Sequence, residues 1–288
     1  MRIAVYHMLV SILKPLEVDA AYASAQCAVE VHRRLAAFLR VGQTLAQIDA
    51  FVGKTLEVLD CTSCFKSYVT RGHGPFPAHA CLSVNQCIVH GHPMAYTAPI
   101  AAGDLVKLDI GVMHRGWIGD VGWTYCMGEP TGVQRKLMDC GKEALRRGIA
   151  TIHPKNTLSL FAKAVEQHVE KECGFFCVSG LGGHGYGRKL HGVPYVPNYT
   201  PGLMESPWPE GKAHWVAGML VAVEPMISVG TRAIRDEPHP YNRNWTDWPV
   251  YTADGSLSVH FEHDILVTEE GCRVLSEGME AIDNIIKI

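Results

Sequence analysis

The sequence has no long run of charge of one sign. Its 26 lysines and arginines nearly balance 29 aspartates and glutamates, which leaves a formal net charge of −3. Phosphate backbones and anionic lipid headgroups are bound by clustered cations. The balance therefore argues against nucleic acid or a membrane surface as the main partner.

The sequence also has no apolar run that could span a bilayer. The N-terminal stretch Ile3–Leu13 is apolar but much shorter than the roughly 20 residues that a transmembrane helix needs. Lys14 and Pro15 follow where a secretory signal would carry small residues for cleavage. We therefore expect a buried opening strand or turn at this stretch.

A disulfide framework is missing as well. The cysteines are scattered through expected helices and strands, unlike those of a small secreted scaffold, so we expect reduced thiols in a cytoplasmic protein. Cys61 and Cys64 have the CxxC spacing of zinc and redox sites, but no second pair completes it, so a structural zinc is the weaker alternative. The ten cysteines are Cys27, Cys61, Cys64, Cys81, Cys87, Cys126, Cys140, Cys173, Cys177 and Cys272.

Apolar residues at helical spacing in one stretch, and cap signals at three later positions, predict four helices. The chain has 288 residues and is 47% hydrophobic, which is enough for a sizeable core. Thr44 with Gln47, and Thr131 with Gln134, have the spacing of capping boxes at helix starts. The expected helices run over Glu17–Arg40, Leu45–Leu59, from Thr131 to about Thr151, and from a Thr157 cap to about Glu172.

Strand-like segments follow each pair of helices. This order occurs twice, before and after about residue 130, and predicts one α+β domain over 1–288 with two similar halves, about 17–130 and 131–275. Each helix pair would cover part of a shared antiparallel sheet. The Pro- and Trp-rich segments 194–215 and 236–251 are expected as surface excursions over a cleft. The expected strands are Ala80–Val84, Cys87–His90, the hairpin in Leu105–Gly122, Leu220–Val229 and His260–Thr268.

The hairpin in Leu105–Gly122 contains two acids inside apolar strands. If His114 and Arg115 form its loop, Asp109 lies opposite Asp120, and a bulge at Gly116 would shift this by one position. Two buried carboxylates at such a distance are unfavourable unless a proton or a cation lies between them. The hairpin is therefore either a metal site or a partly exposed pair of strands with solvated acids.

Three later segments offer further metal ligands. Residues 182–192 read GGHGYGRKLHG, with His184 and His191 seven apart, and the alternative is a flexible glycine loop. Glu224 lies in the apolar run LVAVEPMIS, although strand alternation could place it on a solvent face. Glu262 follows in HFEHDILVT among three possible partners.

Together these segments supply four carboxylates and one imidazole, a set that suits one or two borderline or hard divalent ions. Four negative charges in one pocket require about two such ions. Two adjacent metal ions can activate water and polarise a carbonyl, so the implied chemistry is hydrolysis.

The order of these residues resembles a known family. Two aspartates eleven apart, then GGHG with a second histidine seven on, then VEP, then FEHD are similar to methionine aminopeptidases of the short bacterial type I form, over about Glu17 to Val274. The resemblance implies the duplicated pita-bread α+β fold. It also implies removal of the initiator methionine from nascent proteins and peptides with a small second residue, using two divalent ions (Co, Mn, Fe, Ni or Zn).

The resemblance also implies the metal ligands. Asp109 would bind one ion and Asp120 would bridge the two, while His184 and Glu224 would complete the second ion and Glu262 would bridge.

Three of the residues would act in catalysis. Glu224 would take and return the proton of the attacking water. His90, in IVHG, would stabilise the region of the scissile amide, and His191 would hydrogen-bond the substrate carbonyl or the oxyanion.

The resemblance is weaker in the substrate pocket. The pocket would be lined by Phe76, Cys81, Leu190 and Trp248, with His90 and His191 also contacting substrate. Leu190 stands where an aromatic residue is usual in the family. The other departures are Thr70 and His73, in place of Cys and Tyr, and Gln86, in place of an acid.

Two alternatives stay open. One is a related dinuclear peptidase with altered or proline-linked specificity, although such enzymes usually carry an N-terminal domain that the 16 residues before the first helix would not supply. The other is a non-catalytic binding protein on the same fold, although such proteins lose ligands that are all present here. The expected partners are N-termini of nascent chains or peptides, with the ribosome a further candidate and no nucleic acid or membrane, and we expect a monomer.

Overall fold

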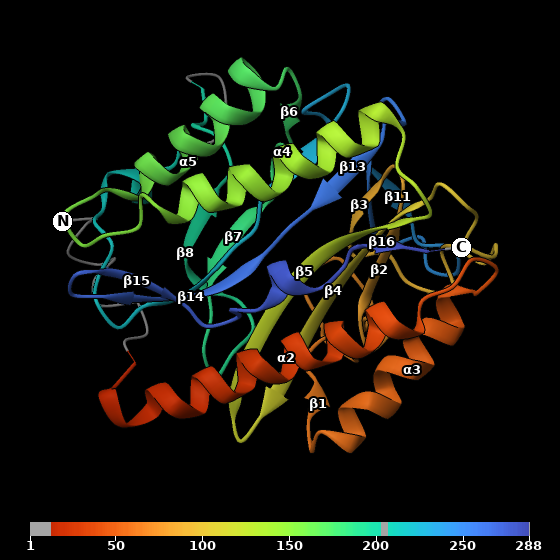
Figure 1. Ribbon diagram of the computed structural model, residues 1–288, viewed down its shortest axis with the longest axis horizontal. Coiled ribbons are helices and arrows are strands. Elements are labelled where there is room, and N and C mark those ends of the chain that lie inside the picture. The colour runs from red at the N-terminus through yellow and green to blue at the C-terminus, as the bar shows by residue number, and fades with distance from the viewer. Residues whose placement is uncertain (1–12, 203–206, 288) are drawn as a thin grey trace.

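The structure is a computed structural model that describes residues 13–202 and 207–287. Two helix pairs lie on opposite sides of the strands in Figure 1. The first pair is α2 (Val18–Phe38) and α3 (Leu45–Val58), and the second is α4 (Gly132–Ile149) and α5 (Leu158–Glu166). The short helices are η1 (Pro15–Glu17), the π-helical η2 (Gln167–Glu172), η3 (Pro209–Lys212) and η4 (Met279–Ala281).

All four predicted helices are confirmed to within a few residues, and the caps explain where two of them begin. Thr44 and Thr131 each form the predicted capping box with the glutamine three residues on. Thr157 occupies the N-cap position of α5 but makes no side-chain cap bond, because its hydroxyl pairs with Ser159 instead. The predicted opening strand at Ile3–Leu13 lies outside the described residues except for Leu13, which is buried.

Within the described residues, the strands form two five-stranded sheets and two three-stranded sheets; the C-terminal strand joins the sheet of the first half. All pairs are antiparallel except the one between β5 and β16. The first large sheet has β1 (Thr62–Ser63), β4 (Leu105–His114), β5 (Trp117–Met127) and β16 (Ile285–Ile286) in order, with β2 (Cys81–Val84) on β4. The second has β15 (Gly271–Val274), β14 (His263–Thr268), β9 (Leu220–Val223), β7 (Gly182–Gly185) and β8 (Gly192–Pro197).

The two small sheets join segments that are distant in sequence. One contains β13 (Ser258–His260), β10 (Met226–Ser228) and β6 (Phe176–Cys177). The other contains β11 (Ile234–Pro238), β12 (Thr246–Thr252) and β3 (Cys87–Val89), so it connects the two halves. The division into two related halves stays a prediction, which the repeated order of helix pair and sheet supports.

The two expected surface excursions are largely structured. Segment 236–251 lies mostly in the β11–β12 hairpin, which pairs with β3. Its first ten residues are mostly exposed, and Asp236, Thr246 and Trp248 line a cavity, as expected for a surface segment over a cleft. Segment 194–215 begins within β8 and ends at Trp215, which is only 1% exposed. In the part of the chain that the structure describes, none of the helices has the length and apolar character to cross a membrane.

The register of the β4–β5 hairpin differs from the predicted one. Arg115 and Gly116 form the loop, so His114 pairs with Trp117 and Asp109 pairs with Gly122, while Asp120 pairs with Gly111. Both loop residues have positive φ, 50° and 80°, as the two-residue type I′ turn requires. The shift is two positions, which keeps both aspartates on the same face as diagonal neighbours.

A buried histidine links α2 to β5 and gives a pH-dependent prediction. His32 is fully buried, with Nδ1 3.0 Å from the Tyr125 hydroxyl and Nε2 2.8 Å from the Val121 carbonyl oxygen. Burial lowers its pKa from 6.5 to about 4. The stability given by the neutral ring is therefore fully present above about pH 6.5 and is lost as the pH falls toward 4.

We expect wild-type protein to lose about 2 kcal/mol more unfolding free energy than His32→Gln between pH 7 and pH 5. Urea unfolding of both metal-free proteins at the two pH values measures this difference. Equal losses in the two proteins would show that His32 is not the titrating group.

Candidate active site

The five predicted ligands converge on one cavity of about 350 Å³. Each comes from a different segment of the fold. The side chains are Asp109 on β4, Asp120 on β5, His184 on β7, Glu224 directly after β9, and Glu262 between β13 and β14.

The separations between these side chains suit metal binding. His184 Nε2 lies 3.8 Å from an oxygen of Asp120 and 3.7 Å from an oxygen of Glu224. Atoms that share an ion at about 2.0–2.2 Å can be at most about 4.4 Å apart. In two groups, Asp120–His184–Glu262 and Asp109–His260–Glu262, the candidate ligand atoms all lie within 4.8 Å of one another.

The electrostatics of the cavity also favour a cation. Burial raises the pKa of Asp109, Glu224 and Glu262 well above the ordinary range, and the charge of Asp120 raises each of them further. Burial raises the pKa of Asp120 to about 7. One buried carboxylate oxygen each of Asp109 and Asp120 has no hydrogen-bond partner among the described residues. Such oxygens are costly to leave bare, so the residues fit divalent ions.

The predicted histidine ligand has the protonation state that binds metal. Burial lowers the pKa of His184 to about 3. Its imidazole is therefore neutral at physiological pH, and neutral imidazole is the metal-binding form.

The sequence analysis missed His260, which is part of the same cluster. It is 1% exposed, and its Nε2 lies 3.2 Å from an oxygen of Glu224 and 3.8 Å from an oxygen of Glu262. Neither ring nitrogen makes an aligned hydrogen bond among the described residues. Gly122 provides the room, because a Cβ there would lie 2.6 Å from the His260 ring.

Asp264 was also missed, and it holds the β5 backbone at the site. It is fully buried, and its Oδ2 accepts a hydrogen bond from the Asp120 backbone N–H at 2.9 Å. His263, between these residues in sequence, instead bonds Ser276 and Glu280. The only signal in the sequence was the cluster of polar residues around Glu262.

The two predicted catalytic histidines line the cavity together with the ligands. His90 directly follows β3 in a left-handed conformation, φ 58°, and burial lowers its pKa to about 4. The His191 ring centroid lies 4.4 Å from that of His184. The Tyr68 hydroxyl lies 2.7 Å from His191 Nδ1 and orients this ring, a partner that the sequence analysis did not identify.

The predicted pocket residues Phe76, Cys81, Leu190 and Trp248 all line the cavity. Trp248 is fixed by its Nε1–H, which donates to the Gly74 carbonyl at 2.9 Å, and its ring meets Phe76 edge-on at 5.3 Å.

The residues that depart from the family divide into two groups. Thr70 and His73 line the cavity, and the His73 ring centroid lies 4.7 Å from that of Trp248. Gln86 is exposed and lies outside the described lining, so it is not placed to affect substrate.

Comparison with known proteins agrees with this site. Residues 20–269 match the metallopeptidase family M24. Methionine aminopeptidase 1 of Mycobacterium tuberculosis is 33% identical over 91% of this chain and 93% of its own length. Methionine aminopeptidase 1 of Bacillus subtilis is 31% identical over 85% of this chain and 90% of its own length.

Solved structures agree on the fold. The methionine aminopeptidase of Thermotoga maritima superposes with a TM-score of 0.81 at 30% identity, over 93% of this chain and 99% of the other. A prolidase from Pyrococcus furiosus shares the fold, with a TM-score of 0.69 at 18% identity, over 95% of this chain and 67% of the other. The predicted pita-bread fold is confirmed. The chain belongs to metallopeptidase family M24, and within it to the methionine aminopeptidases.

Proposed function

We propose that the five clustered ligands hold two divalent metal ions, with which this metallopeptidase removes N-terminal methionine. The observation that carries the proposal is the convergence of four buried carboxylates on His184, with oxygens of Asp109 and Asp120 left unpartnered among the described residues. When bound, divalent ions supply Lewis acidity toward the scissile carbonyl and make water nucleophilic near neutral pH.

Glu224 is the proposed proton carrier. Its carboxylate is held between His184, at 3.7 Å, and His260, at 3.2 Å. As a carboxylate beside the bound ions, it would take a proton from the attacking water and return it to the leaving amine.

His191 and His90 are proposed to contact the peptide. The Tyr68 hydroxyl holds His191 through Nδ1, which fixes the ring that would hydrogen-bond the substrate carbonyl or the developing oxyanion. His90 lines the same cavity and packs edge-on against Trp248 at 6.1 Å, and we propose that its neutral ring stabilises the region of the scissile amide.

The pocket chemistry suits methionine. Phe76 and Trp248 offer aromatic surfaces, and Cys81 adds a polarisable thiol, which favour a flexible thioether. Leu190 leaves the wall less aromatic than the family pattern. We expect the crowded ligands to admit only a small second residue.

We expect kcat/KM for Met-Ala-Ser to exceed that for Met-Lys and Met-Val peptides, with norleucine accepted nearly as well as methionine. One methylene in an apolar pocket changes discrimination by only about 1–3 kcal/mol. Leu-Ala-Ser should be cleaved slowly, and Leu190→Phe should lower that rate further relative to Met-Ala-Ser.

Metal-supplemented assays on these peptides test the proposal. Equal rates on Met-Lys and Met-Ala would contradict the rule for the second residue. Faster cleavage of Leu or Pro-containing substrates such as Ala-Pro would contradict methionine specificity and favour the proline-linked alternative. Repeating the assay with Co, Mn, Fe, Ni and Zn identifies the supporting ion.

We further propose that the enzyme acts in the cytoplasm, as a monomer, on the N-termini of nascent chains and peptides. Its ten free thiols support a reducing compartment. Light scattering after gel filtration tests the monomer, and co-sedimentation tests the ribosome as a further partner.

A further inference from the structure

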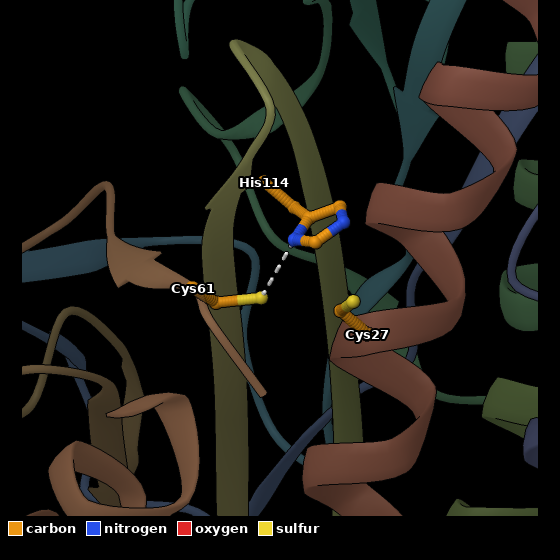
Figure 2. A group of neighbouring side chains, drawn as sticks. All are labelled: Cys27, Cys61 and His114. Carbon is orange, nitrogen blue, oxygen red and sulfur yellow. Dashed lines mark hydrogen bonds between the residues drawn. The ribbon is translucent and has the colours of Figure 1, made fainter. Parts of the chain in front are cut away.

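A second group of metal-type ligands lies outside the active-site cavity. Figure 2 shows Cys27, Cys61 and His114 pointing toward one another. They come from three elements, since Cys27 is on α2, Cys61 directly precedes β1, and His114 ends β4. Their Sγ and imidazole nitrogen atoms all lie within 4.8 Å, and Cys61 Sγ is 3.5 Å from His114 Nδ1.

This group is separate from the acid-rich centre. Side chains alternate along a strand, so His114 and Asp109 lie on opposite faces of β4. The CxxC pair is split in the same way. Cys64 lies on the Asp109 face, where a Cβ at Gly111 would be 2.4 Å from its Sγ, whereas Cys61 turns toward α2. The three residues do not appear among the described residues that line the cavity.

We propose that Cys27, Cys61 and His114 bind one zinc ion. Zinc lies about 2.3 Å from sulfur and about 2.0–2.1 Å from nitrogen with tetrahedral angles, which puts sulfur and nitrogen ligands about 3.6 Å apart. The observed 3.5 Å between Cys61 Sγ and His114 Nδ1 matches this separation. Two sulfurs and one imidazole also prefer zinc over the harder ions that suit a carboxylate cluster.

Binding requires both thiols to lose their protons. The contact with Cys61 lowers the pKa of the Cys27 thiol to about 7, and the same contact raises the pKa of the Cys61 thiol, whose proton the bound ion has to displace. The ion replaces the two thiol protons, which leave to solvent, while the imidazole proton moves to Nε2 and frees Nδ1 from the Asp60 carbonyl, now 3.2 Å away. Cys27 is only half-buried, so water can reach the fourth position.

The bound ion would tie α2 to the hairpin that carries Asp109 and Asp120.

A second group, Cys140, His168 and Cys173, has the same ligand types. There His168 Nδ1 is already 3.1 Å from a Glu172 oxygen, and all three residues belong to neighbouring helical segments of the second half. It is the competing assignment that an experiment has to separate.

Cobalt substitution of the chelator-stripped, reduced full-length protein provides the test. A thiolate ligand gives Co²⁺ an intense ultraviolet charge-transfer band that oxygen and nitrogen ligands do not give. We expect this band in wild type, with an intensity that corresponds to one thiolate-bound Co²⁺ per chain, and its disappearance when Zn²⁺ is added.

The expected band should be absent in Cys27→Ser/Cys61→Ser, with one zinc fewer per chain by native mass spectrometry. His114→Gln should bind zinc at least about 10-fold more weakly, the lower bound for disturbing a metal's surroundings. Cys272→Ser is the matched control, because this half-buried thiol belongs to neither ligand group and hydrogen-bonds the Ile149 carbonyl oxygen at 3.7 Å.

Three outcomes would overturn the site. The first is the absence of the band in wild type, a result that does not depend on whether any variant folds. The second is a band that survives in Cys27→Ser/Cys61→Ser and disappears in Cys140→Ser/Cys173→Ser. The third is a Cys27–Cys61 disulfide in place of zinc in natively purified protein. Each leaves the aminopeptidase proposal intact, because neither thiol lines the cavity.

Discussion

Glu262→Ala and Asp120→Ala are each expected to lose detectable turnover of Met-Ala-Ser and tight binding of a second divalent ion. Glu262 is the one residue shared by the two ligand groups, Asp109–His260–Glu262 and Asp120–His184–Glu262. A carboxylate in that position can contact both ions, so its removal should weaken binding of the second ion and abolish turnover. Metal content by mass spectrometry and kcat on the same samples measure both effects.

The same cluster predicts that bound metal reverses the order of the Tm values of wild type and Glu262→Gln. Without metal, Glu262 is a buried carboxylate whose pKa is raised by burial and by the charges of Asp120 and Glu224. Glu262→Gln should therefore have a higher Tm than wild type after chelation and a lower one in saturating metal.

Glu280→Gln is the matched control for this reversal. Its carboxylate bonds His263, the neighbour of Glu262 in sequence, but is largely exposed. It should keep activity, metal content and the wild-type order of Tm values. Full activity of Asp120→Ala or Glu262→Ala at limiting metal would contradict the two-ion assignment.

The clustered carboxylates could be singled out from the sequence because they are locally anomalous. Asp120 and Glu224 lie among apolar strand residues, where an unpaired carboxylate is costly, and the anomaly remains visible without any knowledge of the fold. The capping boxes at Thr44 and Thr131 are local in the same way. Such signals need only a few neighbouring residues to be interpreted.

The hairpin register shows the limit of local signals. Arg115 was correctly predicted to lie in the loop, but the second loop residue is Gly116 and not His114. The type I′ turn needs two residues in the left-handed conformation, which arginine rarely adopts. The residues around Arg115 therefore did not indicate this turn type. The error did not move either aspartate to the other face, because a shift of two preserves the alternation.

The missed residues depend on contacts between distant segments. Tyr68 meets His191 across 123 positions of sequence, and Asp264 meets the Asp120 backbone across 144. Cys27 reaches Cys61 only because α2 packs on the hairpin sheet. No periodicity or spacing encodes these contacts, so they follow only from the tertiary structure.

His184 and His191 should respond differently to the same substitution, although their rings are 4.4 Å apart. His184→Ala removes a nitrogen 3.7–3.8 Å from two carboxylates and should lose bound metal as well as activity. His191→Ala should keep its metal, because this ring bonds Tyr68 and belongs to neither ligand group. Its kcat should fall by about 10²-fold or more, the effect of removing one oxyanion donor.

Tyr68→Phe is the graded control for His191, because it keeps the imidazole and removes only the hydroxyl at Nδ1. It should leave metal content unchanged and reduce kcat less than His191→Ala does, since a donor that is poorly oriented still acts part of the time. Steady-state kinetics on Met-Ala-Ser at saturating metal, with metal content measured on the same preparations, separates these effects. If His184→Ala and His191→Ala retain the same amount of metal, the assignment of one as ligand and the other as substrate contact is wrong.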